Sequence, residues 1–408
     1  MKKILFCPLI FLVFLLMPVL SPAYDWGLLL DQDTGLENAD DLARGFSYSA
    51  ALVPWFSAPL SEDAKLYLSA GISANYKNET WAFVPQLFRT DFTYRIGSGA
   101  QIRAGRMFYS DPLGFIASGL FDGLHFTLDS SLGVLGLGVW YTGFLYNKNA
   151  QITMTAGDLE VTNRDLDYSD FVNTYFAPRR LAAALDWDIS ELVNPLRLKF
   201  ALIGQFDLTG NDDYLNSQYL AVKTGINAGD FILDLGISAA LSQTPDYSSE
   251  TKFGLGFAGE LGAGWILPTP ITDQLTFTGR FSSGTVDDSI LTAFAPLTTA
   301  SQGDILQAKL SGLSMLRLDY TARPISNLTF SIADSYFILS DLGTYSGYPG
   351  GRDGYFLGNE FFGRIIWSPV SDLRLTLGGG IFLPSMGNAA GSEDPQWRLE
   401  LNAVLVLF

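Results

Sequence analysis

The sequence predicts an all-β fold, a single transmembrane antiparallel β-barrel of about 18 strands, with about 16 strands as the second choice. Hydrophobic residues make up 48% of the chain and charged residues only 16%. After residue 23, no segment reaches the roughly 18 consecutive apolar residues of a membrane helix. The chain instead repeats segments of about 10–14 residues in which apolar and polar side chains alternate, with turns between them. A closed sheet of such segments spans lipid with its backbone groups paired.

Residues 1–23 have the pattern of a secretory signal peptide. Two lysines follow the first residue, an apolar stretch runs through Leu20, and small residues end the segment at Ala23. A membrane-anchoring helix is the weaker alternative, because prolines interrupt the apolar stretch and nothing later supports a helical membrane topology. We therefore expect residues 24–408 to form the barrel after export to the bacterial outer membrane. The only cysteine, Cys7, would leave with the signal peptide, so no disulfide or thiolate site is expected.

The eighteen expected strands follow one another along the chain with no linker between domains. The alternation is clearest in the ninth, twelfth and seventeenth, where leucine and phenylalanine occupy one face and charged residues or glycine the other. The predicted strands are 24–30, 45–57, 64–77, 81–95, 98–108, 120–129, 132–145, 178–189, 195–207, 215–228, 231–242, 251–265, 272–284, 308–321, 327–338, 355–367, 371–383 and 395–408.

The last of these segments, 395–408, ends on an aromatic residue. Apolar side chains point to one face, while Arg398, Glu400 and Asn402 point to the other. An apolar outside and a polar inside are typical of a wall between lipid and a watery lumen. Phe408 has the parity of the polar set, and by resemblance to other outer-membrane barrels we expect it to be a signal for the barrel-assembly machinery.

The connections between the predicted strands alternate in length. Those after even-numbered strands are mostly tight turns, whereas those after odd-numbered strands include the long loops 31–44, 109–119, 146–177, 285–307, 339–354 and 384–394. Outer-membrane barrels show this asymmetry, with short turns in the periplasm and long loops outside the cell. An even strand count then places both termini on the periplasmic side.

The formal net charge of −17 at first suggests a channel that repels anions. Sorting the charges by strand alternation reverses that inference, because most acidic residues fall in loops and the lumen faces are mixed to mildly basic. Charges cannot face lipid cheaply, since an Arg at the midplane costs about 2–4 kcal/mol. Some of them are expected only to pair across neighbouring strands. The predicted channel-lining residues are Arg89, Asp91, Arg106, Asp122, His125, Arg180, Arg197, Lys199, Arg280, Arg317, Glu360, Arg364, Arg374, Arg398 and Glu400.

One pair of arginines departs from the alternation. Arg103 and Arg106 cannot share a face of a regular strand, so either Gly105 marks a bulge or one of the two arginines lies at the rim. We expect Arg106 to face inward.

Two stretches carry motifs beyond those of a generic barrel. Residues 104–126 contain Gly-Arg at a strand end and, after a loop, Phe-Asp-Gly-Leu-His-Phe; residues 358–383 contain Gly-Asn-Glu, Trp-Ser-Pro and Gly-Gly-Gly-Ile-Phe-Leu-Pro. Together they resemble the alginate-export porin family. The resemblance implies an eighteen-stranded barrel and places Arg106, Asp122 and Glu360 in the channel wall.

The sequence favours a porin, a water-filled channel for passive diffusion of small hydrophilic solutes of sugar-like or anionic character. The alternative is a surface adhesin that binds partners through long acidic loops. A hydrolase is disfavoured because His125 is the only histidine, and no catalytic residues, metal ligands or cofactors are predicted. The expected partners are outer-membrane lipid, the barrel-assembly machinery and the solutes, and no nucleic acid. Monomer and trimer both remain open.

Overall fold

The computed structural model describes residues 24–38, 45–190, 193, 195–210, 213–245, 250–284, 286–287, 290–341, 354–390 and 393–407. The predicted signal peptide, 1–23, and the terminal Phe408 lie outside the described residues.

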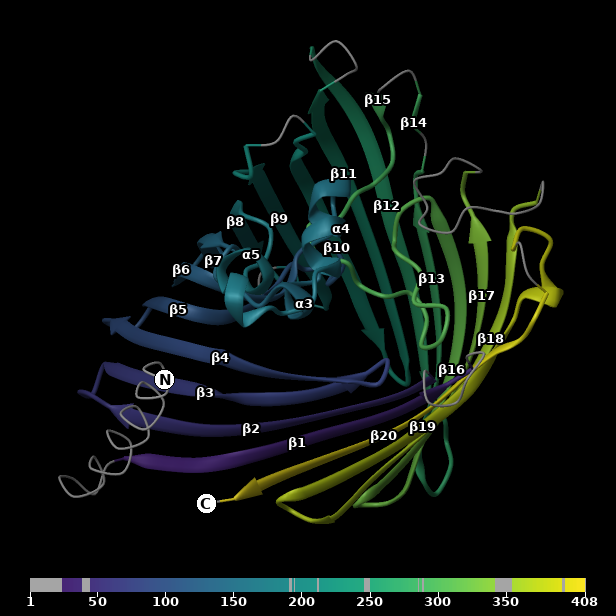
Figure 1. The fold of residues 1–408 in the computed structure, drawn as a ribbon, viewed down its shortest axis with the longest axis horizontal. Helices are drawn as coiled ribbons and strands as arrows, with labels where there is room; N and C mark the ends of the chain where they lie inside the picture. The colour runs from purple at the N-terminus through teal and green to yellow at the C-terminus, as the bar shows by residue number, and fades with distance from the viewer. Residues whose placement is uncertain are drawn as a thin grey trace.

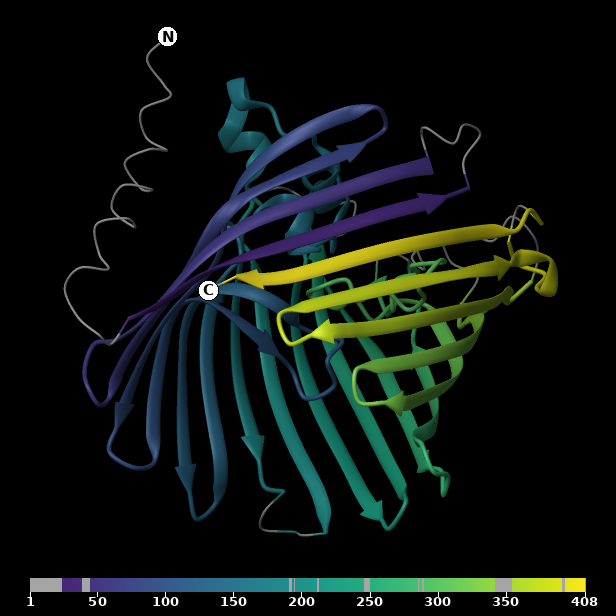
Figure 2. The same ribbon diagram turned by 90° about the horizontal axis from the view of Figure 1, so that it is seen from below.

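Eighteen of the described strands form one antiparallel sheet that closes on itself, because β1 pairs with both β2 and β20. Figure 1 shows the ring, and Figure 2 shows the strands of its two sides crossing, as tilted barrel strands do. These strands are β1 (Asp25–Glu37), β2 (Phe46–Pro59), β3 (Ala64–Lys77), β4 (Thr80–Ile96), β5 (Ala100–Ser110), β6 (Ser118–Ser130), β7 (Gly133–Tyr141), β8 (Arg180–Asp188), β9 (Leu196–Asp207), β10 (Asn216–Ala228), β11 (Phe231–Pro245), β12 (Thr251–Ile266), β13 (Thr272–Ser282), β16 (Leu313–Ile325), β17 (Leu328–Leu339), β18 (Phe356–Val370), β19 (Leu373–Leu383) and β20 (Gln396–Leu407).

The predicted barrel of eighteen strands is confirmed, with differences at some strand ends. β1 continues to Glu37, because it stays paired with β20 up to Arg398. β7 stops at Tyr141, where the chain turns into the interior. The strand predicted from residue 308 begins at Leu313. Ala308 and Leu310 precede it and are fully buried in hydrophobic clusters, so they are not part of the wall.

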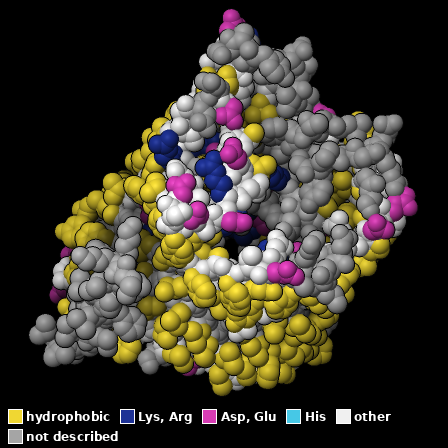
Figure 3. Space-filling view, viewed as in Figure 1, with side chains coloured by type: hydrophobic (Ala, Val, Ile, Leu, Met, Phe, Trp, Pro, Cys, Tyr) yellow, Lys and Arg dark blue, Asp and Glu magenta, His cyan; other side chains and the backbone are white. Residues whose placement is uncertain are grey.

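The outer face of the barrel is apolar. On β20 Leu399 and Leu401 are exposed, whereas Arg398 and Glu400 point inward into ion pairs. In Figure 3 hydrophobic side chains cover the lower part of the described surface. In the absence of lipid such side chains count as exposed, and in a membrane they would contact acyl chains. Among the described residues no helix is long and apolar enough to cross a membrane.

One part of the wall is not continuous. β4 and β5 pair only between Phe92↔Ala104 and Ile96↔Ala100, so residues 80–91 of β4 and 105–110 of β5 separate. We call these two unpaired stretches the β4–β5 seam. Because an unpaired strand edge leaves carbonyls without partners, other groups must fill it.

The side chains that fill the seam come partly from the segment between β7 and β8. Tyr168 and Tyr175 donate their hydroxyl groups to the carbonyls of Phe83 and Pro85. Pro85 itself has no N–H, so it suits an edge that has lost its neighbour. The wall is therefore sealed here by side chains instead of by a strand ladder.

Short helices and a small hairpin lie in the connections. They are α3 (Asn147–Ala150), α4 (Ala156–Asn163), η2 (Tyr168–Asp170), α5 (Phe171–Tyr175), η4 (Pro384–Met386) and the two-stranded β14 (Val286–Asp287) with β15 (Ile290–Leu291). Figure 1 shows α3, α4 and α5 inside the ring, next to β4 to β8.

Candidate functional site

Three connections fold into the barrel and narrow its interior. They are residues 111–117 between β5 and β6, residues 142–179 between β7 and β8, and residues 292–312 before β16, and we call them the first, second and third inward segments. Buried side chains from all three segments meet in one hydrophobic cluster that includes Phe115, Ile116, Met154, Phe294 and Leu297. The interior of the barrel is thus partly filled by loops of the same chain.

The first inward segment is held by a single buried carboxylate. One oxygen of Asp111 accepts the N–H groups of Leu113 and Gly114 at 2.8 and 3.0 Å. The other accepts those of Ile116 and Ala117, each at 2.9 Å. Burial raises the pKa of the Asp111 carboxyl, and the four amide donors act against that shift. These bonds satisfy the polar backbone of a loop that turns away from solvent.

The second inward segment is tied to the wall through Arg180. Its guanidinium donates to Asp158 of α4 at 2.5 Å and to Asp207 of β9 at 3.0 Å. It also donates to the side-chain oxygen of Gln205 and the carbonyl of Leu215, each at 2.9 Å. Asp158 has a second task, because it forms a capping box with Thr155 at the start of α4. Helix position and ion pair therefore depend on the same carboxylate.

The third inward segment is held by Glu360 of β18. Its carboxylate accepts the backbone N–H groups of Asp304, Ile305 and Leu306 at 2.8 to 2.9 Å. Because Glu360 is almost fully buried by this contact, its charge is compensated by the three amides rather than by water.

The segments are also bonded to one another. The N–H of Thr298 donates to the carbonyl of Ile116 at 3.2 Å, and the N–H of Ser118 donates to the Thr298 hydroxyl at 2.8 Å. The N–H of Thr299 donates to the carbonyl of Gln151 at 2.8 Å. The three segments therefore form one connected constriction.

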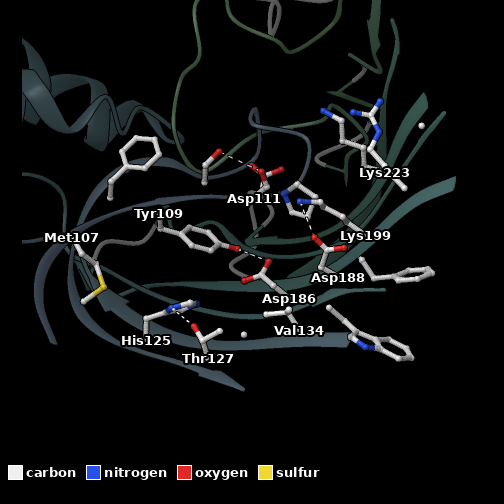
Figure 4. A pocket seen from close by; sticks show the side chains of 18 of the residues that line it. Met107, Tyr109, Asp111, His125, Thr127, Val134, Asp186, Asp188, Lys199 and Lys223 are labelled. Carbon is white, nitrogen blue, oxygen red and sulfur yellow. Dashed lines mark hydrogen bonds and ion pairs between the residues drawn. The ribbon is translucent and has the colours of Figure 1, made fainter. Parts of the chain in front are cut away.

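A cavity of about 600 Å³ lies beside this constriction, toward the ends of the strands that carry the short turns. It is lined by residues of β5 to β11 together with Asp111 and Pro112 of the first inward segment. In Figure 4 the Tyr109 hydroxyl points to Asp186, and Lys199 reaches Asp188, with distances of 3.0 and 2.9 Å. The cavity wall thus combines aromatic surface with both signs of charge.

A second polar surface, from β16, β18 and β20, carries alternating charges that we call the charge row. Arg317 binds Asp319 at 3.0 Å and Asp304 of the third inward segment at 2.9 Å. Arg364 binds the other oxygen of Asp304 at 3.1 Å and Glu400 at 3.2 Å. Glu400 also lies 3.7 Å from Arg398. The side chains of the row are 18% to 34% exposed. Figure 3 shows a hollow near the centre of the molecule with charged side chains around it.

The structure brings most of the predicted channel-lining residues to the interior and pairs them. Arg89 binds Asp91 at 2.6 Å, and Arg103 binds the same carboxylate. Arg280 binds Glu260 at 2.6 Å and Gln302 of the third inward segment at 3.0 Å.

Arg197, Lys199 and His125 line the cavity, with Arg197 bound to Asp234 at 2.9 Å. Arg374 alternates with the outward Leu373 and Leu375 and is exposed. Arg180 and Glu360 face inward but are buried under the inward segments, so they anchor loops rather than face the open lumen.

Arg106 and Asp122 need a correction. They are register partners on β5 and β6, and they share the strand face of the exposed Leu124 and Phe108, which is the outer face. The prediction that Arg106 faces inward and lines the channel with Asp122 is therefore wrong. The residue that faces the lumen is Arg103.

The physical reason lies in the β4–β5 seam. Arg106 donates to both oxygens of Asp122 at 2.9 and 2.7 Å, and to the carbonyls of Leu87 and Phe144 at 2.6 and 2.9 Å. Its donors thereby join β4, β6 and the second inward segment. A fully hydrogen-bonded bidentate pair tolerates this position, where a lone charge would not. Gly105 has a φ of +118°, and a Cβ there would meet the Thr90 carbonyl oxygen at 2.4 Å, so the close approach of β5 to β4 at the start of the seam needs glycine.

The sequence-based prediction missed Asp111, Asp158 and Asp304. Asp111 accepts backbone bonds within the first inward segment, and Asp158 and Asp304 tie the second and third segments to arginines of the wall. All three lie in connections between strands, one of them in the short helix α4, where the alternation of a strand gives no face assignment. One usable signal was the Thr155–Asp158 capping pattern, which marks a helix start inside a loop.

Comparisons with known proteins concern the fold. No protein-family model matches the chain, and no curated protein matches its sequence. Solved structures do match: OccK2 (OpdF) of Pseudomonas aeruginosa has a TM-score of 0.62 at 12% identity, covering 94% of this chain and 98% of that one. The outer-membrane protein OprD of the same organism has a TM-score of 0.60 at 14% identity, over 95% and 96%. This chain has the fold of these outer-membrane porins. A third match, OpdK of P. aeruginosa with vanillate, has a TM-score of 0.60 at 13% identity, over 94% and 99%.

These neighbours support the porin fold and the eighteen strands, but not the alginate-export family suggested by the two sequence motifs. Two of the three residues carried over from that resemblance, Arg106 and Asp122, form the ion pair that bridges the seam, which we call the clasp of the seam, and Glu360 anchors a loop. The motifs therefore mark how the wall and its loops are built.

Proposed function

We propose that this protein is an outer-membrane porin, a water-filled channel for passive diffusion of small hydrophilic solutes. The observation that carries the proposal is a closed barrel with an apolar outer face and a charged interior, narrowed by three inward segments of its own chain. Charged side chains at a constriction are a recurring means by which pores select solutes.

The solutes are proposed to be sugar-like or anionic. Arginine and lysine side chains line the cavity, and arginines form part of the charge row. They provide hydrogen-bond donors for the carboxylate or hydroxyl groups of a solute. The carboxylates interspersed among them argue against a strongly basic pore for polyuronates. Membership of the alginate-export family rests on the two sequence motifs alone.

Localisation and assembly belong to the same proposal. The apolar belt suits outer-membrane lipid, residues 1–23 would direct export and be removed, and the C-terminal strand would be read by the barrel-assembly machinery. The channel lining is proposed to comprise the inward-facing residues of the predicted set that are open to the lumen, without Arg106 and Asp122 and without the buried Arg180 and Glu360.

Recording from planar lipid bilayers tests the proposal. Purified folded protein is expected to give discrete conductance steps in a potassium chloride solution, and reversal potentials with mono- and polyvalent anions then report selectivity. Protein that inserts as a folded barrel and shows no conductance would overturn the proposal.

The alternative of a surface adhesin gains no support from the structural neighbours, which are porins. The second inward segment, residues 142–179, packs into the barrel instead of extending from it. Porins are not enzymes, and we propose no catalytic role for His125, whose ring stacks on Trp140 and lies 3.5 Å from the Thr127 hydroxyl.

A further inference from the structure

The carboxylate of Asp304 differs from the other acidic groups of the charge row because it does not belong to the wall. It comes from the third inward segment and reaches two arginines on different strands, Arg317 of β16 and Arg364 of β18. One oxygen binds each guanidinium, at 2.9 and 3.1 Å. This is the geometry that a permeating anion with two oxygens would adopt at the same pair of arginines.

Each of the two arginines keeps a second partner in the wall. Arg317 binds Asp319 of its own strand, and Arg364 binds Glu400 of β20. An arginine has five N–H donors, so neither guanidinium depends on Asp304 for its position. Loss of the Asp304 contact would therefore leave both arginines in place with free donors.

The backbone of Asp304 is held independently of its side chain. Glu360 accepts the N–H groups of residues 304, 305 and 306, whatever the Asp304 carboxylate does. The carboxylate can thus leave the arginines by a side-chain rotation while the segment stays in the constriction. Arg317, Arg364 and Asp304 are 22%, 34% and 18% exposed, so water reaches all three, and ion pairs open to water exchange readily.

The charge balance of the row depends on this residue. Arg317, Arg364 and Arg398 face Asp304, Asp319 and Glu400, three basic against three acidic groups. Without the Asp304 charge the row would carry one net positive charge, located at the two arginines beside the inward segment.

We propose that Asp304 is a tethered counter-ion that sets the ion selectivity of the channel by competing with permeating anions for Arg317 and Arg364. The inference rests on the proposed porin function and adds one residue that decides selectivity. While the Asp304 carboxylate binds the two arginines, the charge row has no net charge and does not attract anions. When a permeating anion displaces this carboxylate, the anion binds Arg317 and Arg364 and can move on along the charge row.

The test compares two variants that remove one negative charge each from the row. Asp304→Asn removes the bridging carboxylate, and Asp319→Asn is the matched control because, among the described residues, Asp319 forms an ion pair with Arg317 only, and it lies on a wall strand. Reversal potentials in a potassium chloride gradient across a planar bilayer give the anion-to-cation permeability ratio. Asp304→Asn is expected to raise this ratio about twofold or more, and Asp319→Asn clearly less. Circular dichroism of each folded variant confirms that the barrel is retained.

A double variant checks the mechanism. In Asp304→Asn with Arg317→Gln, the row has two charges of each sign again, and the ratio is expected to return toward the wild-type value. Equal shifts in Asp304→Asn and Asp319→Asn, or no shift in Asp304→Asn, would overturn the role of Asp304. A wild-type barrel that does not conduct would instead overturn the proposed function, so the two failures are distinguishable.

Discussion

Two arginine sites in this barrel have the same connectivity and opposite surroundings. Arg180 lies between Asp158 of the second inward segment and Asp207 of the wall, and all three side chains are at most 1% exposed. Arg317 lies between Asp304 of the third inward segment and Asp319 of the wall, but these side chains are 18% to 26% exposed. Each site thus pairs one loop carboxylate and one wall carboxylate with a guanidinium.

The difference shows how burial decides what an ion pair does. A buried pair is costly to break, because removal of one partner leaves an uncompensated charge in a medium that cannot solvate it. A pair open to water is worth about 0–1 kcal/mol, and a solute ion can replace one of its members. We therefore expect Arg180 to fix the second inward segment, and Arg317 to be available for binding a solute anion.

The largest effect is expected from Arg180→Met. The substitution leaves Asp158 and Asp207 buried without their cation, which costs about 3–5 kcal/mol. The second inward segment should detach from β8 and β9, so single-channel conductance should rise and the urea midpoint of unfolding should fall. Asp165→Asn is the control, because Asp165 lies on the same segment but is fully exposed and pairs with Lys148. A wild-type urea midpoint in Arg180→Met would remove the distinction between the two sites.

A smaller effect is expected from Glu360→Gln, which weakens the anchor of the third inward segment. The neutral amide accepts fewer and weaker bonds from the N–H groups of residues 304–306, at a cost of about 1–3 kcal/mol. Because Asp304 moves with this backbone, the anion-to-cation permeability ratio should rise together with the conductance. If conductance rises while selectivity stays constant, the position of Asp304 does not depend on Glu360.

The clasp of the seam should affect stability alone. Arg106→Lys keeps the charge but loses the fork that binds Asp122, Leu87 and Phe144 together, at a cost of about 1–2 kcal/mol. We expect a lower urea midpoint with wild-type reversal potentials, since Arg106 lies on the outer face of its strand. A changed permeability ratio would show that Arg106 faces the lumen after all.

The smallest effect is expected at the cavity wall. Lys199 and Asp188 form a 2.9 Å pair in which both side chains are well exposed. Lys199→Gln should change the free energy of unfolding by about 0.5 kcal/mol or less. Its permeability ratio should fall slightly, because a positive charge leaves the cavity. A loss of stability comparable to that of Arg180→Met would mean that exposure does not separate structural from solute-facing pairs.

The strands could be predicted because their side chains repeat with a period of two, and the period assigns a face to every residue between two turns. Arg317, Arg364, Arg398 and Glu400 were placed inside in this way. The assumption that a charged side chain faces the lumen failed at Arg106, because β4 and β5 separate there and the outer face is no longer bare lipid surface. Pro85, inside a predicted strand, was an available sign of an unpaired edge.

The inward segments could not be predicted, because their contacts join residues far apart in the chain. Asp304 meets Arg364, which lies 60 positions away in the sequence, and Tyr175 meets Pro85, which lies 90 positions away. Loop sequences have no period that indicates such partners. Only the assembled wall brings them together.

The pairing of β1 with β20 joins the two ends of the chain, from Leu28↔Leu407 to Glu37↔Arg398. Contacts between residues so distant in sequence form slowly, because a long loop must close before they contribute any free energy. Until the last strand has arrived, both edges of the sheet expose unpaired backbone groups that invite pairing with other chains. We therefore expect ring closure to be a late step in the folding of this protein. A chain that lacks residues 396–407 should accumulate as an aggregating intermediate instead of a slightly smaller barrel.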